Sequence, residues 1–321
     1  MKKLSPPATS PPATDSSAHL PEGEGIIVAH HGVAVEVRFS SGERRMVRVK
    51  RRSGHVVGDA VRVLGEVLEQ LPRHTELRRR DAMSGVHLVG ANLDVLGIVV
   101  CPAPPPPPGF VDQAIVAARV AKLVPFVLVN KCDLAISADF FAEVKATYAS
   151  TMEVFPLSAA TGEGLDALRA FFAAGHRGAF VGTTGVGKSS LLNTLCPEIN
   201  LQVGTLNEHT GKGCHTTTVS TLHSLEAGGE LIDTPGFNDF GLVDISAEEL
   251  SLYFPGFEQS RSESCRFRNC RHRTEPGCAV SALVTQGRIT AERYATYLEI
   301  LDAIETSETQ TRSRGWKNRE R

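Results

Sequence analysis

Residues 182–189 limit the possible folds of this 321-residue chain more than any other segment. They read Gly-Thr-Thr-Gly-Val-Gly-Lys-Ser, which fits the pattern G-x-x-x-x-G-K-S/T, and they stand between the apolar run 179–181 and the helical run 190–196. Between a strand and a helix, such glycines let backbone N–H groups approach phosphates, and the helix adds the positive end of its dipole. The segment therefore predicts a nucleotide-phosphate loop.

Side chains of this loop and of a second acidic motif define the predicted phosphate and Mg²⁺ site. Lys188 is expected to reach the β- and γ-phosphates, and the Ser189 hydroxyl to ligate Mg²⁺. Asp233 follows the apolar pair 231–232 and would hold the same ion through a water, while the Gly236 backbone N–H would meet the γ-phosphate. The Asp-Thr-Pro-Gly tetrapeptide alone could be a turn, but its place 44 residues beyond Ser189 favours the nucleotide interpretation. The other loop residues predicted to contact the nucleotide are Gly182, Thr183, Thr184, Gly185, Val186, Gly187 and Ser190.

A motif earlier in the chain predicts which base is bound. The apolar run 127–129 is followed by Asn-Lys-Cys-Asp, which fits the N-K-x-D guanine reader of GTPases. The Asp133 carboxylate would accept hydrogen bonds from guanine N1–H and the 2-amino group, a donor pair that adenine lacks. Asn130 would brace the loop, and the Lys131 stem would lie across the base. The motif therefore argues for GTP and against an ATPase.

The order of the motifs is reversed relative to an ordinary GTPase. Ser158 and Ala159 follow a strand-like run and fit the accessory guanine loop, whose backbone N–H meets the base O6. Both guanine motifs precede the phosphate loop, whereas N-K-x-D normally comes late in the chain. A sheet domain tolerates such a circular permutation if its original ends lie close together. The sequence therefore predicts a circularly permuted P-loop domain.

The segment before these motifs has the period of a half-buried β-structure. In residues 24–75, Val35 and Val37 alternate with charged side chains, and Val61 and Val63 repeat the pattern, with Gly and Ser in the gaps. Several short strands in about fifty residues predict a small β-barrel such as an OB-fold. Further on, buried-strand runs such as 125–129 alternate with helical stretches such as 137–148, which predicts an α/β sheet. The proline run 104–108 is expected to be a stiff strand-to-helix connection without a specific function.

A cluster of metal-ligand residue types lies near the C-terminus. Cys265, Cys270, His272 and Cys278 place three thiols and one imidazole within fourteen residues. Cys₃His is a ligand set of tetrahedral structural zinc sites. Buried free thiols and an iron–sulfur cluster are the alternatives, but free cysteines rarely cluster so densely in a chain without a secretory signal. We expect one structural Zn²⁺ per chain. Five arginines surround the ligands and predict a local basic patch: Arg261, Arg266, Arg268, Arg271 and Arg273.

These observations predict a multidomain chain, and its charge distribution suggests a phosphate-rich partner. Residues 36–80 carry twelve Lys and Arg against six Asp and Glu, although a solvated charged face is the simpler explanation for any single run. No apolar run is long enough to cross a bilayer, so we expect no membrane association and a cytoplasmic location. The predicted parts are a disordered tail (1–22), an OB-fold RNA-binding domain (23–80), a circularly permuted α/β GTPase domain (81–245), a mainly helical zinc-binding domain (246–308) and a basic tail (309–321).

Together these features resemble the RsgA family, also called YjeQ or YloQ, of circularly permuted GTPases. The specific markers are the permuted order, the stretch Gly-Lys-Gly-Cys-His-Thr-Thr-Thr at 211–218, and Cys-Arg-Phe-Arg-Asn-Cys-Arg-His-Arg-Thr-Glu-Pro-Gly-Cys at 265–278. The resemblance implies an OB-fold, a GTPase domain and a zinc domain in that order. It also implies late maturation of the small ribosomal subunit, binding to its 16S rRNA near the decoding region, and stimulation of GTP hydrolysis by the subunit. The chain departs from the family at Thr183 and Thr184, where Gln-Ser is usual.

The resemblance also implies roles in the loop that precedes the second acidic motif. Residues 215–218 would be switch I, with Thr217 as a Mg²⁺ ligand in the GTP state. Phe237 stands where many GTPases carry the Gln that orients the attacking water, so His215 or a partner must supply that contact. We predict slow unassisted hydrolysis by a chain that is monomeric off the ribosome. The alternative function is a GTP-gated RNA-binding module with incidental turnover.

Overall fold

The structure, a computed structural model, describes residues 22–80, 85–199, 219–233, 242–261 and 265–317. Five short strands form the N-terminal barrel: β1 (Gly23–His30), β2 (Ala34–Phe39), β3 (Arg44–Arg48), β4 (Ala60–Leu64) and β5 (Val67–Gln70). β1 pairs with both β2 and β4, and β3 and β5 continue the two sides. The apolar positions of the alternating segments, Val35, Val37, Val61 and Val63, are all buried in the barrel core, as their period predicts.

A separate two-stranded sheet follows the barrel. β6 (Glu76–Arg80) and β7 (Val86–Ala91) pair antiparallel, and the hairpin spans the boundary predicted at residue 80. Arg78 in β6 reaches Asp244, at 2.9 Å, and the Arg80 Nε donates to the Leu242 carbonyl at 3.5 Å. The hairpin therefore contacts the segment that follows the Asp233 motif. The domain boundaries themselves stay predictions.

The central sheet contains the strands predicted from the apolar runs. Its strands are β8 (Val95–Val100), β9 (Val124–Val129), β10 (Val154–Pro156), β11 (Arg177–Val181), β12 (Ser220–Ser224) and β13 (Glu230–Asp233). They lie in the order β10-β9-β8-β11-β13-β12, and all neighbours are parallel except β12 and β13. β8 is buried along its whole length, which explains its continuous apolar sequence.

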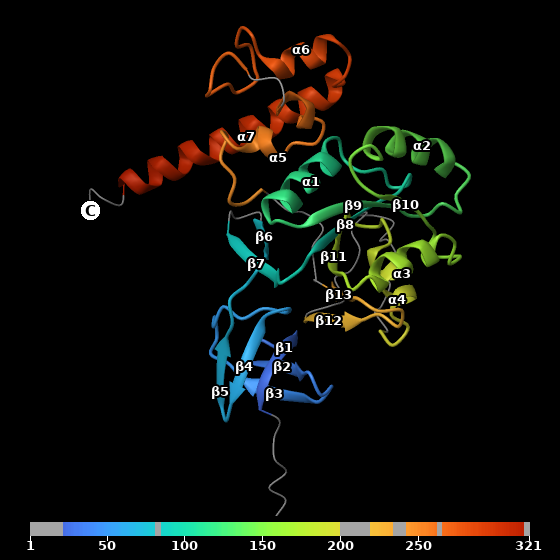
Figure 1. Ribbon diagram of the computed structural model, residues 1–321, viewed down its shortest axis with the longest axis vertical. Helices are drawn as coiled ribbons and strands as arrows, with labels where there is room; N and C mark the ends of the chain where they lie inside the picture. The colour runs from blue at the N-terminus through green and yellow to red at the C-terminus, as the bar shows by residue number, and fades with distance from the viewer. Residues whose placement is uncertain (1–21, 81–84, 200–218, 234–241, 262–264, 318–321) are drawn as a thin grey trace, which may run out of the picture.

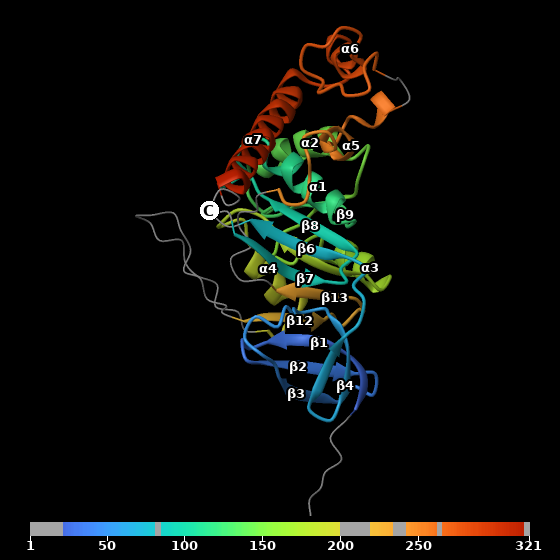
Figure 2. The same ribbon diagram turned by 90° about the vertical axis from the view of Figure 1, so that its left-hand side faces the viewer.

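Helices cover both faces of this sheet. α1 (Phe110–Val120) and α2 (Ser137–Tyr148) pack on one face through residues such as Ile115 and Val144, while α3 (Leu165–Ala173) and α4 (Lys188–Leu195) cover the other (Figure 1). On the far edge, β12 pairs with β1 of the barrel, so that one continuous sheet of eleven strands runs through both regions (Figure 2).

The C-terminal region is mainly helical. It contains α5 (Leu250–Tyr253), the 3₁₀ turn η1 (Glu258–Arg261), α6 (Ala279–Thr285) and the long α7 (Ala291–Lys317). The Thr290 hydroxyl accepts a hydrogen bond from the Arg293 N–H at 3.2 Å and so caps α7. In α7, the apolar residues Tyr297, Leu301 and Ile304 recur at helical spacing and lie in the core, packed with Val116 of α1. Within the described residues, no helix is long and apolar enough to span a membrane.

Candidate nucleotide site and metal centre

The phosphate-loop segment joins the end of β11 to the start of α4, as its motif requires. Gly185 and Gly187 adopt φ values of 85° and 98°, in the left-handed region that favours glycine. A Cβ on Gly182 would lie 2.5 Å from the Val99 carbonyl oxygen, so only glycine fits against β8. The Lys188 ammonium donates to the carbonyl oxygens of Gly182 and Thr183, at 2.6 and 3.0 Å. These contacts hold the cation inside the loop.

Asn130 joins three motifs that lie far apart in the sequence. Its side chain is 2% exposed, its Nδ2 donates to the Val186 carbonyl at 2.7 Å, and its Oδ1 accepts from the Ala159 N–H at 3.0 Å. A Cβ on Gly187 would come within 2.2 Å of the same Nδ2. The predicted guanine reader, accessory guanine loop and phosphate loop therefore meet at one buried amide, despite the permuted order.

The Asp133 carboxylate is oriented by a neighbour whose side-chain role the sequence did not reveal. The buried Ser158 hydroxyl donates to Asp133 Oδ1 at 2.5 Å and accepts from the N–H groups of Ala160 and Thr161, both at 3.2 Å. Sequence reasoning assigned only a backbone contact to this serine. The hydrogen bond fixes one oxygen of the Asp133 carboxylate.

Lys131 contacts a loop that sequence reasoning left without a function. Its backbone has a φ of 64°, and its ammonium donates to the Ala103 carbonyl at 2.7 Å. Ala103 stands directly before the proline run 104–108, which connects β8 to α1. The proline loop therefore borders the guanine reader, and only the fold brings the two together.

The predicted Mg²⁺ ligands come from adjacent elements. Asp233 ends β13 and is 9% exposed, and Ser189 lies in the first turn of α4. β13 runs parallel to β11 with Ala179 opposite Ile232, so the carboxylate stands at the same edge as the phosphate loop. A hydroxyl and a carboxylate suit Mg²⁺, which prefers oxygen ligands. The predicted residues His215, Thr217 and Gly236 lie outside the described residues.

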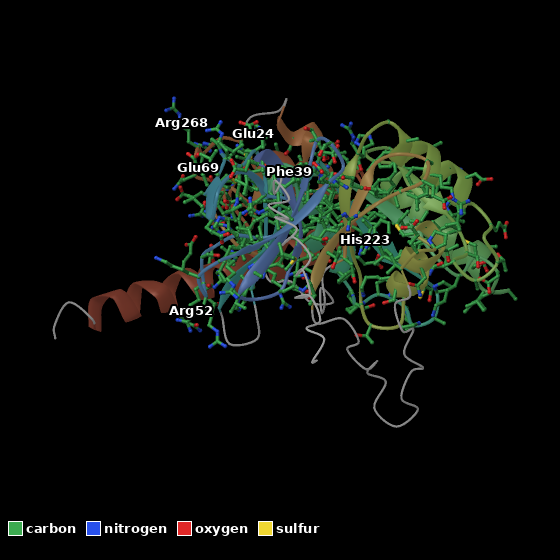
Figure 3. The ribbon with its side chains drawn as sticks, turned by 90° about the horizontal axis from the view of Figure 1, so that it is seen from below. Glu24, Phe39, Arg52, Glu69, His223 and Arg268 are labelled. Atoms are coloured by element: carbon green, nitrogen blue, oxygen red, sulfur yellow. The ribbon has the colours of Figure 1, made fainter. Side chains whose placement is uncertain are left out.

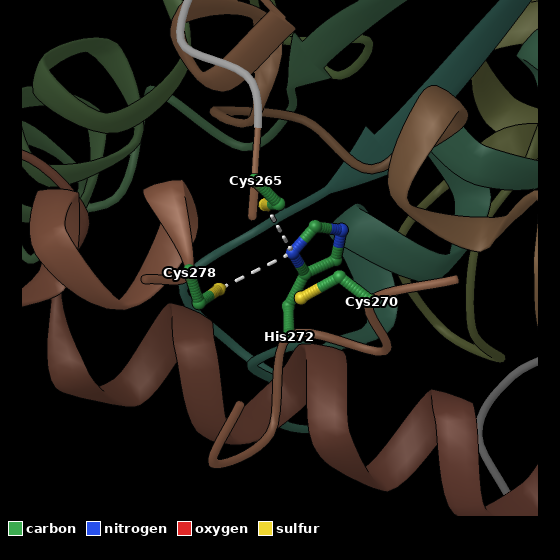
Figure 4. Close-up of side chains that lie close together, drawn as sticks. All are labelled: Cys265, Cys270, His272 and Cys278. Atoms are coloured by element: carbon green, nitrogen blue, oxygen red, sulfur yellow. Dashed lines mark hydrogen bonds between the residues drawn. The ribbon is translucent and has the colours of Figure 1, made fainter. Parts of the chain in front are cut away.

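The four predicted zinc ligands converge on one point (Figure 4). The ligand atoms of Cys265, Cys270, His272 and Cys278 all lie within 4.8 Å of one another. His272 Nδ1 is 3.6 Å from Cys265 Sγ and 3.4 Å from Cys278 Sγ. A tetrahedral Zn²⁺ with bonds of about 2.3 Å to sulfur and 2.0 Å to nitrogen separates such atoms by about 3.6 Å. The cluster can therefore hold a metal, and its geometry fits zinc.

The backbone around the cluster is built to present these ligands. Cys278 caps α6 by accepting from the Ser281 N–H at 3.4 Å, and Cys265 Sγ accepts from the Ala279 N–H at 3.3 Å. The Tyr294 hydroxyl donates to the His272 carbonyl at 2.6 Å. Burial lowers the pKa of His272, which favours the neutral imidazole that a metal requires. Burial raises the pKa of the Cys270 thiol to about 12, so without a metal it is protonated.

The arginines expected to form a basic patch around this cluster are partly paired. Arg271 pairs with Glu248 at 3.0 Å, and Arg273 pairs with Asp302 and Glu305 of α7. Arg266 and Arg268 are exposed. In the barrel region, a run of exposed basic side chains lies on and after β3: Arg48, Lys50, Arg51 and Arg52. The two exposed groups are the described surfaces best suited to phosphates.

A large cavity lies away from the nucleotide loop. It has a volume of about 690 Å³ and lies between α1, α7 and residues 242–245, lined by Gln113, Ile300 and Ile304 among others. None of the predicted nucleotide or metal ligands lines it.

Comparison with known proteins identifies the family. The model of the RsgA GTPase family matches residues 70–243. The chain is 40% identical over 299 residues to the Small ribosomal subunit biogenesis GTPase RsgA of Azotobacter vinelandii, covering 88% of this chain and 86% of the relative. The protein of the same name from Pseudomonas fluorescens is 39% identical at the same coverage.

Two solved structures share the architecture. YjeQ from Thermotoga maritima aligns with a TM-score of 0.72 and 29% identity, over 88% of this chain and 98% of that one. YloQ, described as a circularly permuted GTPase, aligns with a TM-score of 0.66 and 25% identity, over 91% and 98%. The predicted combination of barrel, permuted α/β domain and helical region with a Cys₃His cluster is confirmed. The chain belongs to the RsgA GTPase family.

Proposed function

We propose that this chain hydrolyses GTP to GDP and phosphate and acts as a late-stage assembly factor of the small ribosomal subunit. The contact at Asn130 carries the nucleotide part, because it unites the guanine and phosphate motifs in one site. The ribosomal part rests on the relatives, which are named for small ribosomal subunit biogenesis. Action on ribosomal subunits would place the chain in the cytoplasm.

The residues of the site divide the work of hydrolysis. Asp133, held by Ser158, would read the guanine edge, with the Lys131 stem against the base. The amides of the phosphate loop and Lys188 would hold the phosphates and stabilise the charge that develops on them. Ser189, Asp233 and Thr217 would hold Mg²⁺, which supplies positive charge opposite the phosphate oxygens. The Gly236 N–H would contact the γ-phosphate.

The attacking water needs a group to orient it. Phe237, which follows the Asp-Thr-Pro-Gly motif, has no hydrogen-bonding atom in its side chain. His215 is the group of this chain that we propose for this role, and the ribosomal subunit is the alternative source. If the subunit supplies the group, unassisted hydrolysis is slow, because a group missing in this chemistry can cost about 10³-fold or more.

The exposed basic groups would bind 16S rRNA. Arg48, Lys50, Arg51 and Arg52 are exposed on a barrel whose fold commonly binds nucleic acid, and in the view from below Arg52 lies across the barrel from Glu24 and Glu69 (Figure 3). The C-terminal region, with one structural Zn²⁺ on Cys265, Cys270, His272 and Cys278, would present Arg266 and Arg268 as a second contact. Off the ribosome we expect a monomer.

GTP turnover with purified small subunits, large subunits and neither tests the proposal. We expect stimulation by the small subunit alone. Equal turnover in all three would remove the ribosomal role and leave the GTPase in place. If the small subunit binds more tightly with a GTP analogue than with GDP but does not stimulate turnover, the alternative of a GTP-gated RNA-binding module holds instead.

A further inference from the structure

The barrel is joined to the central sheet by backbone hydrogen bonds, and not only by a linker. β1 pairs antiparallel with β12, with Ala29 opposite Thr221 and His30 opposite Ser220. β12 in turn pairs with β13, and β13 with β11 (Figure 2). Two strands, β12 and β13, therefore connect the barrel to β11, which leads directly into the phosphate loop.

An ion cluster reinforces this junction at one end of the strands. Glu230, the first residue of β13, pairs with Arg38 of the barrel strand β2 and with Arg177, the first residue of β11. Arg177 contacts the carboxylate at 2.6 and 2.7 Å, and Arg38 also donates to the Ser224 hydroxyl of β12 at 2.7 Å. The side chains of Glu230 and Arg38 are only 16% and 20% exposed. One half-buried carboxylate thus ties the barrel to two strands of the nucleotide-binding sheet.

The same two strands end at the nucleotide site. β11 runs from Arg177 to Val181 and is followed by Gly182, and β13 runs from Glu230 to Asp233. At about 3.3 Å per residue, the ion cluster lies about 10 Å from the predicted Mg²⁺ carboxylate. A short strand within a close-packed sheet moves as a unit. A displacement at the Glu230 end is therefore also felt at the Asp233 end.

Close packing leaves little room for the barrel and β13 to move independently. The barrel loop at Gly58 is so near β7 that a Cβ there would lie 2.1 Å from the Ala91 carbonyl oxygen. The same Cβ would lie 3.3 Å from Ile232 Cδ1, in the middle of β13. The barrel therefore touches β13 through its side-chain face as well as through the ion cluster.

We propose that Arg38 is a positioning residue that couples RNA binding on the barrel to GTP hydrolysis. It acts through Glu230, which fixes β13 and β11 relative to the barrel, so that a shift of the barrel on rRNA moves Asp233 and the phosphate loop together. Arg38 does not contact RNA in this scheme, because its guanidinium is engaged by Glu230 and Ser224. The proposal rests on the proposed function, in which the small subunit stimulates the GTPase.

The variant Arg38→Ala separates coupling from binding. Basal turnover without subunits should stay within about twofold of the wild type, because the guanine and phosphate contacts are untouched. The maximal subunit-stimulated kcat should fall by about fivefold or more, because coupling between two sites typically changes affinity by about 5- to 150-fold. The subunit concentration that gives half-maximal stimulation should not change, because the RNA contacts remain. Arg38→Lys keeps the charge and should recover part of the stimulation.

Arg62→Ala is the matched control. Arg62 is also a barrel arginine, but it pairs with Glu24 at 2.7 Å and with Glu69 at 3.4 Å, and both glutamates belong to barrel strands. It should keep full stimulation. Wild-type stimulation of Arg38→Ala, or an equal loss in both variants, overturns the coupling role while leaving the proposed function intact. If the wild type itself is not stimulated, the proposed function fails and the coupling role falls with it.

Amide hydrogen exchange gives a readout that needs no ribosome. In the wild type, replacing GDP with a GTP analogue should change the protection of the Ala29 and His30 amides in β1 from hydrogen exchange, because these residues pair with β12. In Arg38→Ala that nucleotide-dependent difference should shrink, while protection of the barrel core at Val35 and Val37 stays as in the wild type. An unchanged difference in β1 would refute coupling through Arg38, and loss of protection throughout the barrel would show a merely structural role.

Discussion

Replacement of Asn130 with alanine tests whether a single side chain holds the guanine and phosphate motifs together. The variant removes the donor to the Val186 carbonyl and the acceptor for the Ala159 N–H, which are bonded at 2.7 and 3.0 Å. Each buried group left without a partner costs about 1–3 kcal/mol. The free energy of unfolding should therefore fall by about 2–6 kcal/mol, which urea denaturation can measure.

The same change should weaken nucleotide binding, because the two loops would no longer be held in one arrangement before GTP arrives. A loss of 1.4 kcal/mol corresponds to a tenfold change in Kd, so we expect GTP affinity to fall by at least about tenfold. Asn130→Asp should be intermediate, because the carboxylate can still accept from the Ala159 N–H but cannot donate to the Val186 carbonyl. Titration with a fluorescent GTP analogue measures the affinity of each variant.

Asn92 provides a control with the same number of hydrogen bonds. Its Nδ2 donates to the Gly58 carbonyl and its Oδ1 accepts from the His74 N–H, both at 2.9 Å, between the barrel and β7. Asn92→Gly keeps the left-handed backbone, whose φ is 56°, and should reduce stability without reducing GTP affinity. If Asn130→Ala binds GTP as the wild type does, or if both variants lose affinity equally, Asn130 is not the organising contact.

Four further predictions follow from the described contacts. Asp133→Asn should weaken GTP binding and favour xanthosine triphosphate in a competition assay, and unchanged GTP affinity would remove the guanine-reader assignment. Cys270→Ser should lower the metal content from about one Zn per chain to near zero by elemental analysis, and full metal content would refute the ligand set. Burial raises the pKa of Glu230, but the combined effect of Arg38 and Arg177 outweighs burial, so the pKa lies below its usual value. Its stabilisation is present above the unfolded pKa of about 4.3 and is lost as pH falls through the lower folded pKa, so Glu230→Gln should be destabilising in urea at pH 7 and approach the wild type as the pH falls below the folded pKa. Replacing Arg51 and Arg52 with alanine should weaken small-subunit binding and flatten its salt dependence by about two counterions, and an unchanged slope would exclude both from phosphate contact.

The features that could be predicted from the sequence are those with local signals. The phosphate loop, the guanine reader and the Cys₃His cluster are short motifs whose residue types are set by their chemistry. The alternation at Val35 and Val37 indicates a half-buried strand, and the helical stripe at Tyr297 and Leu301 indicates a core face. The stretch 137–148 has the bounds of α2 as found. In each case the information lies within about a dozen neighbouring residues.

Contacts between distant segments could not be predicted. Ser158 is 25 residues from Asp133, and nothing in either segment indicates that the hydroxyl orients the carboxylate. Lys131 meets Ala103 only because β8 and β9 are parallel neighbours. Composition predicts an arginine patch near the zinc cluster, but it does not show that Arg271 and Arg273 have acidic partners. Such pairings depend on the register of strands and helices, and a single sequence does not report register.

The permuted order gives the junction between barrel and sheet its significance. In the permuted order, the base-reading half of the central sheet comes first and the Asp233 strand comes last. The barrel therefore precedes the base-reading half, and the helical region follows the Asp233 strand. β12 would otherwise be an edge strand with unpaired backbone groups, and β1 covers part of that edge. On the other side, Arg293 of α7 pairs with the buried Asp112 of α1 at 3.0 Å and stacks over Tyr148 of α2. The nucleotide-binding sheet is therefore held from both flanks, by the barrel at one edge and by α7 through the helices on one face. A ribosomal surface that bound both flanks would strain the sheet between them. The variants at Arg38 and Arg62 distinguish such strain from simple attachment of the barrel to the ribosome.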